Sequence, residues 1–219
     1  MSEKDVIHVT AHVSAAERRI VITAARRLTT CLQKAGATDT NVAVGFDPAN
    51  PACARPGLLI LSPMADLASS DSIPAVEARW LELLDGYSSA GSYNLFLCTL
   101  FRHVPGGPDR AAVVERIRRL NLLMIGLSHA RGAAVVDLDR VFTFFGARTL
   151  ATDYRLSGRA AGRLAAFAIV SAFFEEGLAP WLPNDIEKRA REVHGGESRM
   201  AAFMNDVKRL RTDRAEAPR

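Results

Sequence analysis

The chain has 219 residues, a length typical of one α/β domain, and its 48% hydrophobic and 24% charged residues are ordinary globular values. Its formal net charge is +4, but the arginines alternate with glutamates and apolar residues, a pattern typical of solvated helix faces rather than of a nucleic-acid-binding stripe. Three cysteines, Cys31, Cys53 and Cys98, form an odd number without CxxC spacing, which argues against a disulfide framework or a zinc site.

No targeting or membrane segment is expected from the sequence. The N-terminal stretch MSEKDVIHVT lacks the basic flank and the apolar run of a signal peptide. No stretch reaches the ~18 apolar residues that a membrane-spanning helix needs. We therefore expect a cytoplasmic protein of bacterial type that does not associate with membranes.

Strands and helices are expected to alternate along most of the chain. Strands are indicated by short runs of β-branched and apolar residues, and helices by apolar residues at helical spacing. In chain order, we expect a strand over residues 5–13, a helix over 14–36, strands over 40–46 and 58–61, a helix over 73–91, a strand over 93–101, a helix over 111–132, a strand over 133–137 and a helix within 155–178. The first helix opens with Ser14-x-x-Glu17, the pattern of a capping box.

This alternation predicts βαβ units and a parallel sheet. Five strands with helices on both faces make a flavodoxin-like three-layer α/β/α sandwich, in which ligands bind beyond the carboxyl ends of the strands. Residues 1–182 are expected to form this domain. Residues 183–219 are polar and charged, and are expected to form a C-terminal extension, either a docked helix or a frayed tail.

Several strings between Tyr93 and Gly177 resemble the SGNH (GDSL-type) hydrolase family. These strings are YNLFLCTLFRHVPGGP, HARGAAVVDLDRVF and ATDYRLSGRAAGRLAA. The resemblance implies a serine nucleophile in a Gly-Asp-Ser turn after the first strand, and an oxyanion hole completed by a glycine and an asparagine. It also implies an aspartate and a histidine, three residues apart, that activate the serine.

The sequence departs from this pattern at three places. The first strand is followed by VTAHVSAAE, where Ser14 is the only nearby serine and Gly-Asp-Ser is missing. The family's Gly-x-Asn-Asp corresponds to residues 63–66, where only Asp66 agrees. The last block keeps Asp153 but has Leu156 in place of the histidine. Because leucine cannot accept a proton, the usual triad cannot form at that position.

Three candidate functions follow from this combination of matching and missing family positions. The favoured one is a non-catalytic SGNH hydrolase-like protein that binds a small molecule or a protein partner. The alternative is a carboxylic ester hydrolase or acyltransferase with a rearranged catalytic set of Ser14, His103 and Asp153, since triads are recognised by geometry and not by chain order. A nucleotide- or phosphate-binding flavodoxin-like module, such as a receiver or cofactor domain, ranks third, because the acidic pair that a receiver needs after the first strand is missing.

Other polar residues beyond the strand ends are candidates for ligand binding. They are His12, Ser62, Asp66 and Arg155, the last of which suits a carboxylate or a phosphate. No metal and no cofactor are expected, because the histidines and aspartates have no metal-ligand spacing and no phosphate-loop motif is present. A helical tail after Pro183 is a candidate dimer contact between two copies of the chain.

Overall fold

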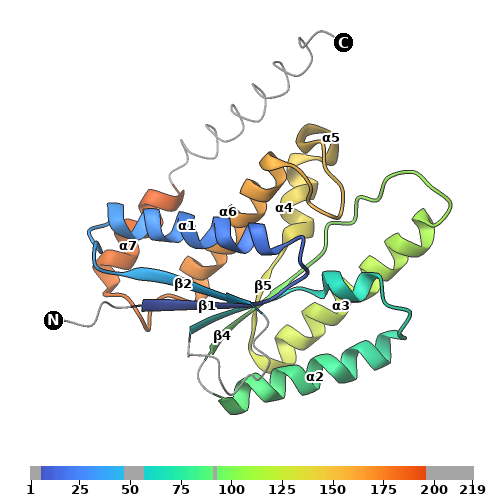
Figure 1. Ribbon diagram of the computed structural model, residues 1–219, viewed down its shortest axis with the longest axis horizontal. Coiled ribbons are helices and arrows are strands. Elements are labelled where there is room, and N and C mark those ends of the chain that lie inside the picture. The colour runs from blue at the N-terminus through green and yellow to red at the C-terminus, as the bar shows by residue number, and fades with distance from the viewer. Residues whose placement is uncertain (1–5, 47–56, 91–92, 196–219) are drawn as a thin grey trace, which may run out of the picture.

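A computed structural model describes residues 6–46, 57–90 and 93–195 (Figure 1). Five strands form one sheet: β1 (Val6–His12), β2 (Asn41–Phe46), β3 (Gly57–Leu61), β4 (Tyr93–Cys98) and β5 (Ala134–Val136). Their order is β2-β1-β3-β4-β5, and every neighbouring pair is parallel. The expected α/β fold with a five-stranded parallel sheet of flavodoxin-like order is confirmed.

Helices cover both faces of the sheet (Figure 1). One face packs against α1 (Arg18–Lys34), α4 (Leu138–Phe145), α6 (Arg159–Glu176) and α7 (Asn184–Gly195), and the other against α2 (Ile73–Ala90) and α3 (Arg110–Arg131). Two shorter helices, η2 (Pro63–Leu67) and α5 (Ala147–Leu150), lie in the connections. The layers are therefore helix, sheet and helix.

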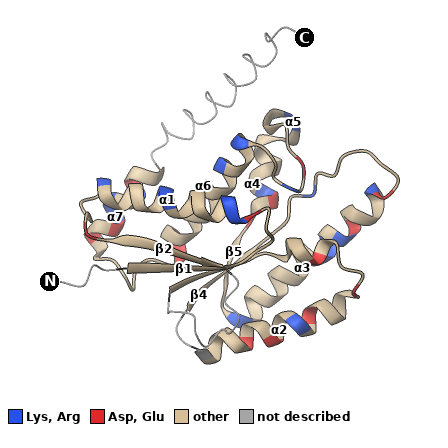
Figure 2. Cartoon of the chain, in the orientation of Figure 1, with Lys and Arg blue, Asp and Glu red and all other residues tan. Residues whose placement is uncertain are grey.

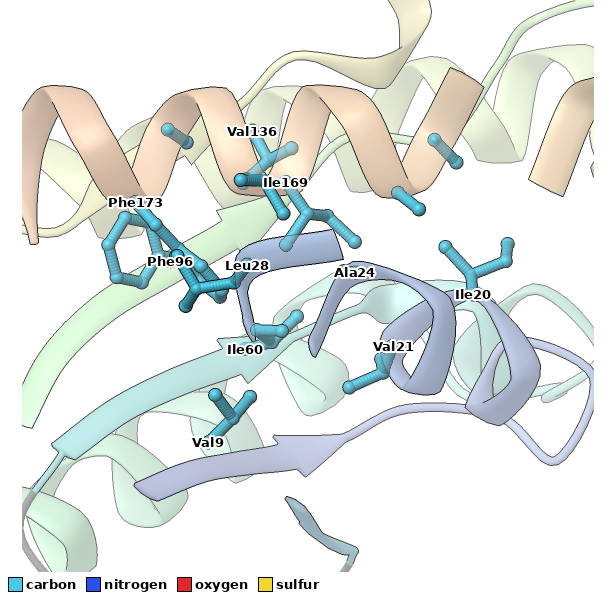
Figure 3. Packing of buried hydrophobic residues seen from close by; sticks show 14 of the residues in the cluster. Val9, Ile20, Val21, Ala24, Leu28, Ile60, Phe96, Val136, Ile169 and Phe173 are labelled. Carbon is cyan, nitrogen blue, oxygen red and sulfur yellow. The ribbon is translucent and has the colours of Figure 1, made fainter. Parts of the chain in front are cut away.

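The alternation of side chains along β3 divides the core into two clusters. Leu58 and Ile60 belong to the cluster under α1 and α6, whereas Leu59 and Leu61 belong to the cluster under α2 and α3. All four are at most 1% exposed, as expected for a central strand with both faces covered. Figure 3 shows Ile60 in the first cluster among side chains of α1 and α6.

The boundaries of several elements differ from those predicted, and β4, for example, ends at Cys98 rather than at residue 101. Helix α1 begins at Arg18 rather than at Ser14, because the Glu17 side chain turns inward and residues 14–17 form a turn. Strand β5 stops at Val136, since Asp137 caps the unpredicted helix α4 by accepting a hydrogen bond from the Arg140 amide.

Helix α7 packs against α1 and α6. Its His194 is buried, with its ring stacked on Phe167 at 4.3 Å between centroids. Arg27 Nε donates to His194 Nδ1 (3.0 Å), so Nε2 carries the ring proton and lies 2.9 Å from Ser171 Oγ. Residues 196–219, most of the predicted C-terminal extension, lie outside the described residues. Within the described part of the chain, no helix is both long and apolar enough to cross a membrane.

Candidate functional site

A buried carboxyl group lies where β1 and β3 end. Glu17, only 6% exposed, accepts hydrogen bonds from Ser14 Oγ (2.7 Å) and the Ser14 amide (3.0 Å) at Oε2, and from Ser62 Oγ (2.6 Å) at Oε1. Ser14 follows β1 and Ser62 follows β3, and these strands are neighbours in the sheet. We call these three residues the Glu17 cluster.

Burial raises the pKa of Glu17 above its ordinary value, while the hydrogen bonds from Ser62 and Ser14 act in the opposite direction. The cluster also affects the neighbouring Cys98 at the end of β4. Burial, and next the charge of Glu17, raise the pKa of the Cys98 thiol. A buried carboxyl group is tolerated because hydroxyl and amide donors replace the water that it has lost. The two serines therefore act as hydrogen-bond donors that hold Glu17 in the interior.

Of the two hydrogen bonds that the predicted capping box of Ser14 and Glu17 would contain, one forms. Glu17 does reach back to the Ser14 amide, as the acidic residue of a capping box does. The Ser14 hydroxyl, however, donates to the same carboxyl oxygen, and the Glu17 amide donates to the Ser14 carbonyl (3.0 Å). The serine at the place of the family's nucleophile is thus bound to a carboxyl group of its own segment.

The block with the family's aspartate keeps its turn. Asp153 Oδ1 accepts from the Arg155 amide (2.9 Å), and the Leu156 amide donates to the Asp153 carbonyl (3.0 Å). Leu156 has φ 52, in the left-handed region that leucine seldom adopts. Its side chain is only 5% exposed and belongs to the core under α6. The position at which the resemblance leads us to expect a histidine therefore holds an aliphatic side chain that packs in the core.

Two of the three residues in the predicted catalytic set lie together. His103 and Asp153 both line an open pocket of about 310 Å³, together with Arg148, Thr152 and Ser157. The Tyr154 amide donates to the His103 carbonyl (2.9 Å) and joins the two loops. Ser14 does not appear among the described residues that line this pocket. The set of Ser14, His103 and Asp153 remains a prediction.

The His103 ring is supported from one side. It stacks on Phe101 with 5.9 Å between centroids and 27° between planes, and Phe101 in turn contacts Phe142 in the core. His103 itself is exposed. The imidazole therefore lies at the surface of the pocket, where its ring stacks on an aromatic neighbour.

The predicted binding residues occupy three environments. Ser62 belongs to the Glu17 cluster. Asp66 is buried, where it accepts from Trp80 Nε1 (2.7 Å) and pairs with Arg79. His12 meets the edge of the Trp80 ring at 5.9 Å, and Arg155 is exposed with its guanidinium over the Tyr154 ring. Asp66 thus has a structural part in fixing η2 to α2, whatever else it does.

The sequence did not reveal that Glu17 is buried. It also did not reveal that four arginines lie beside the His103 pocket. Glu17 has a local signal, an acidic residue one turn after the end of a central strand, but a surface capping box has the same signal. In the described segments, no three or more His, Cys, Asp or Glu side chains gather in an arrangement that could hold a metal ion.

Comparisons with known proteins support the fold. No protein-family profile matches the chain, and no curated protein matches it in sequence. Similar solved structures include the following three. An acetyl xylan esterase has a TM-score of 0.57 at 12% identity, over 76% of this chain and 99% of its own. A proposed SGNH hydrolase from Slackia heliotrinireducens has a TM-score of 0.50 at 15% identity, over 78% and 100%. A lipolytic G-D-S-L family member from Veillonella parvula has a TM-score of 0.50 at 12% identity, over 77% and 97%.

The structural similarity shows a shared fold. Because the sequence identities are low, the activity has to be argued from the residues of this chain. The similarity spans nearly the whole of each of the three proteins. It agrees with the resemblance found in the strings between Tyr93 and Gly177. The chain has the fold of the SGNH hydrolases.

Proposed function

We propose that this chain is a non-catalytic protein of the SGNH fold that binds a small molecule at the carboxyl ends of its strands. The observation that carries the proposal is the burial of Leu156 in the core at the position of the family's histidine. A serine hydroxyl is a weak nucleophile at neutral pH unless a neighbouring base removes its proton. Leucine cannot do this, and its packing leaves the side chain no role at the surface.

The second line of support is the oxyanion hole. The family's glycine and asparagine positions hold Pro63 and Ala65, at the start of η2. Proline has no amide hydrogen and alanine has no side-chain donor. Loss of a single donor costs about 10²–10³ in rate in a well-studied serine protease. A site that lacks both this donor set and the histidine therefore gains little from the Ser14 hydroxyl.

The alternative function is a carboxylic ester hydrolase or acyltransferase with a rearranged site. One observation favours it, namely that His103 and Asp153 line one pocket. This arrangement needs a serine within hydrogen-bond reach of the imidazole in the substrate complex. Ser14 instead donates to Glu17 in this structure, so the alternative requires that hydrogen bond to break.

Ester hydrolysis tests the two functions directly. The purified full chain is incubated with p-nitrophenyl acetate and p-nitrophenyl butyrate, and the release of nitrophenol is compared with that from the Ser14→Ala variant. We expect equal rates from both proteins. A Ser89→Ala variant, which removes an exposed hydroxyl on α2, is the control for nonspecific effects. Turnover that disappears in Ser14→Ala and persists in Ser89→Ala would establish the alternative.

The identity of the bound molecule is a separate question. A small molecule is the proposed ligand because the pocket beside His103 is of a size that suits one. A protein partner is the other proposed occupant. Both would approach the same edge of the sheet.

A further inference from the structure

Two neighbouring pockets share His103 in their walls, and we call them together one groove. The first is the pocket of about 310 Å³ described above, and the second has about 400 Å³. His103 and Ala147 line both pockets, so the two are adjacent. The second pocket runs between the loop after β4, the first turns of α3 and the end of α4. Together they have the volume of a typical small-molecule site.

Four arginines from three segments of the chain line this groove, which we call the arginine groove. Arg102 follows β4, Arg110 and Arg118 lie in the first half of α3, and Arg148 lies in α5. Figure 2 shows basic positions, in blue, on α3 near the loop that joins it to β4. Because residues far apart in the sequence bring these charges together, the groove is a product of the fold and not of one basic run.

Most of this charge has no acidic partner. Arg102 Nε pairs with Asp139 Oδ2 at 2.5 Å, and Arg110 Nε donates to the Val104 carbonyl at 3.2 Å. Over residues 6–46, 57–90 and 93–195, no carboxylate forms an ion pair with Arg110, Arg118 or Arg148. Among the described residues that line the groove, Asp153 is the only acidic one, and Arg155 Nε lies 3.8 Å from its carboxylate.

We propose that the arginine groove binds a small anionic ligand that carries phosphoryl or carboxylate groups. Guanidinium groups bind both of these through paired N–H donors, and several cations around a concave surface attract such a ligand more strongly than one exposed arginine does. The proposal rests on the proposed function, since it names the chemistry of the bound molecule. The imidazole of His103, stacked on Phe101, lies between the two halves of the groove, where it can contact the body of the ligand.

Binding of simple probes by the full chain tests the proposal. Isothermal titration calorimetry is carried out with glucose 6-phosphate, with citrate and with glucose, at low ionic strength because salt screens exposed charges. We expect one or both of the anions to bind with a dissociation constant in the roughly millimolar range or below, and glucose not to bind. Binding of glucose 6-phosphate alone identifies phosphoryl chemistry, and binding of citrate alone identifies carboxylate chemistry.

Single substitutions locate the site. Arg118→Gln and Arg148→Gln each remove one charge from an exposed side chain in the groove, and each is expected to weaken anion binding roughly tenfold. Arg26→Gln removes the same charge from an exposed position on α1, outside the groove, and is expected to have little effect. Circular dichroism of each variant shows that the fold is retained.

Two results would overturn the proposal. One is that neither anion binds at roughly millimolar concentration. The other is that Arg26→Gln weakens binding as much as Arg118→Gln, which would mean that the anion responds only to net charge. Both results leave the ester-hydrolysis assay unaffected. If the chain binds neither anion and hydrolyses no ester, only the proposal of anion binding in the arginine groove is contradicted. If the chain binds an anion and also hydrolyses esters through Ser14, only the proposed absence of catalysis is contradicted.

Discussion

Replacement of Glu17 by glutamine would remove a buried titrating group and keep its shape. Glutamine Oε1 can accept from the Ser14 amide and hydroxyl as Glu17 Oε2 does, and its Nε2 can donate to Ser62 Oγ, which already accepts from the Met64 amide at 3.4 Å. The number of hydrogen bonds in the cluster is therefore unchanged. The difference between the two proteins lies in how their free energy of unfolding depends on pH.

The direction follows from the pKa. Burial raises the pKa of Glu17 above its ordinary value of 4.5, so the folded protein holds the proton more tightly than the unfolded chain does. The stability that this contributes is fully present below pH 4.5 and is lost as the pH rises through the folded pKa. Within that window the wild type is expected to lose up to about 1.4 kcal/mol for each pH unit relative to Glu17→Gln, the limit for one proton.

Urea unfolding, followed by far-ultraviolet circular dichroism at a series of pH values from about 4 to about 8, measures this difference. Glu82→Gln, at an exposed position on α2, is the control for the loss of one negative charge. If the difference between the wild type and Glu17→Gln stays constant across the series, Glu17 is not a buried titrating group and the description of the cluster is wrong.

Three substitutions test the packing by their urea midpoints. Leu156→Ala should destabilise the protein by about 2–5 kcal/mol, because it leaves a cavity in the core under α6. Asp66→Asn should cost about 1–3 kcal/mol, because Trp80 and Arg79 donate to different carboxylate oxygens and the NH2 group that replaces one of these oxygens cannot accept. Gly177→Ala should cost about 1–3 kcal/mol, because the new Cβ would lie 2.6 Å from Phe96 Cζ. A midpoint equal to that of the wild type in any one variant would contradict the contact it tests.

The sequence was sufficient to predict the sheet because its central strands are almost entirely apolar. Leu58–Leu61 and Phe96–Cys98 are buried on both faces, and such runs bounded by loops have few other interpretations. The start of α1 and the existence of α4 were harder to predict. Both depend on how one acidic side chain, Glu17 or Asp137, is used at a helix start, and local spacing does not separate a surface cap from an inward-facing carboxyl group.

The candidate site was predicted only in outline. That His103 and Asp153 would lie beyond the strand ends followed from the rule for parallel sheets, and the two do line one pocket. The arginine groove could not be found in this way. Arg102, Arg118 and Arg148 are separated by helices and a strand, and each was indistinguishable in the sequence from an arginine on a solvated helix face.

Reaction with a fluorophosphonate, read by intact mass, tests the absence of catalysis most directly. The reagent forms a stable bond with a serine only where a base activates the hydroxyl and nearby donors stabilise the resulting oxyanion. With Leu156 in the core and the Ser14 hydroxyl bound to Glu17, we predict that the full chain keeps its unmodified mass. A single phosphonyl adduct that maps to Ser14, and that is absent from Ser14→Ala, would contradict this account.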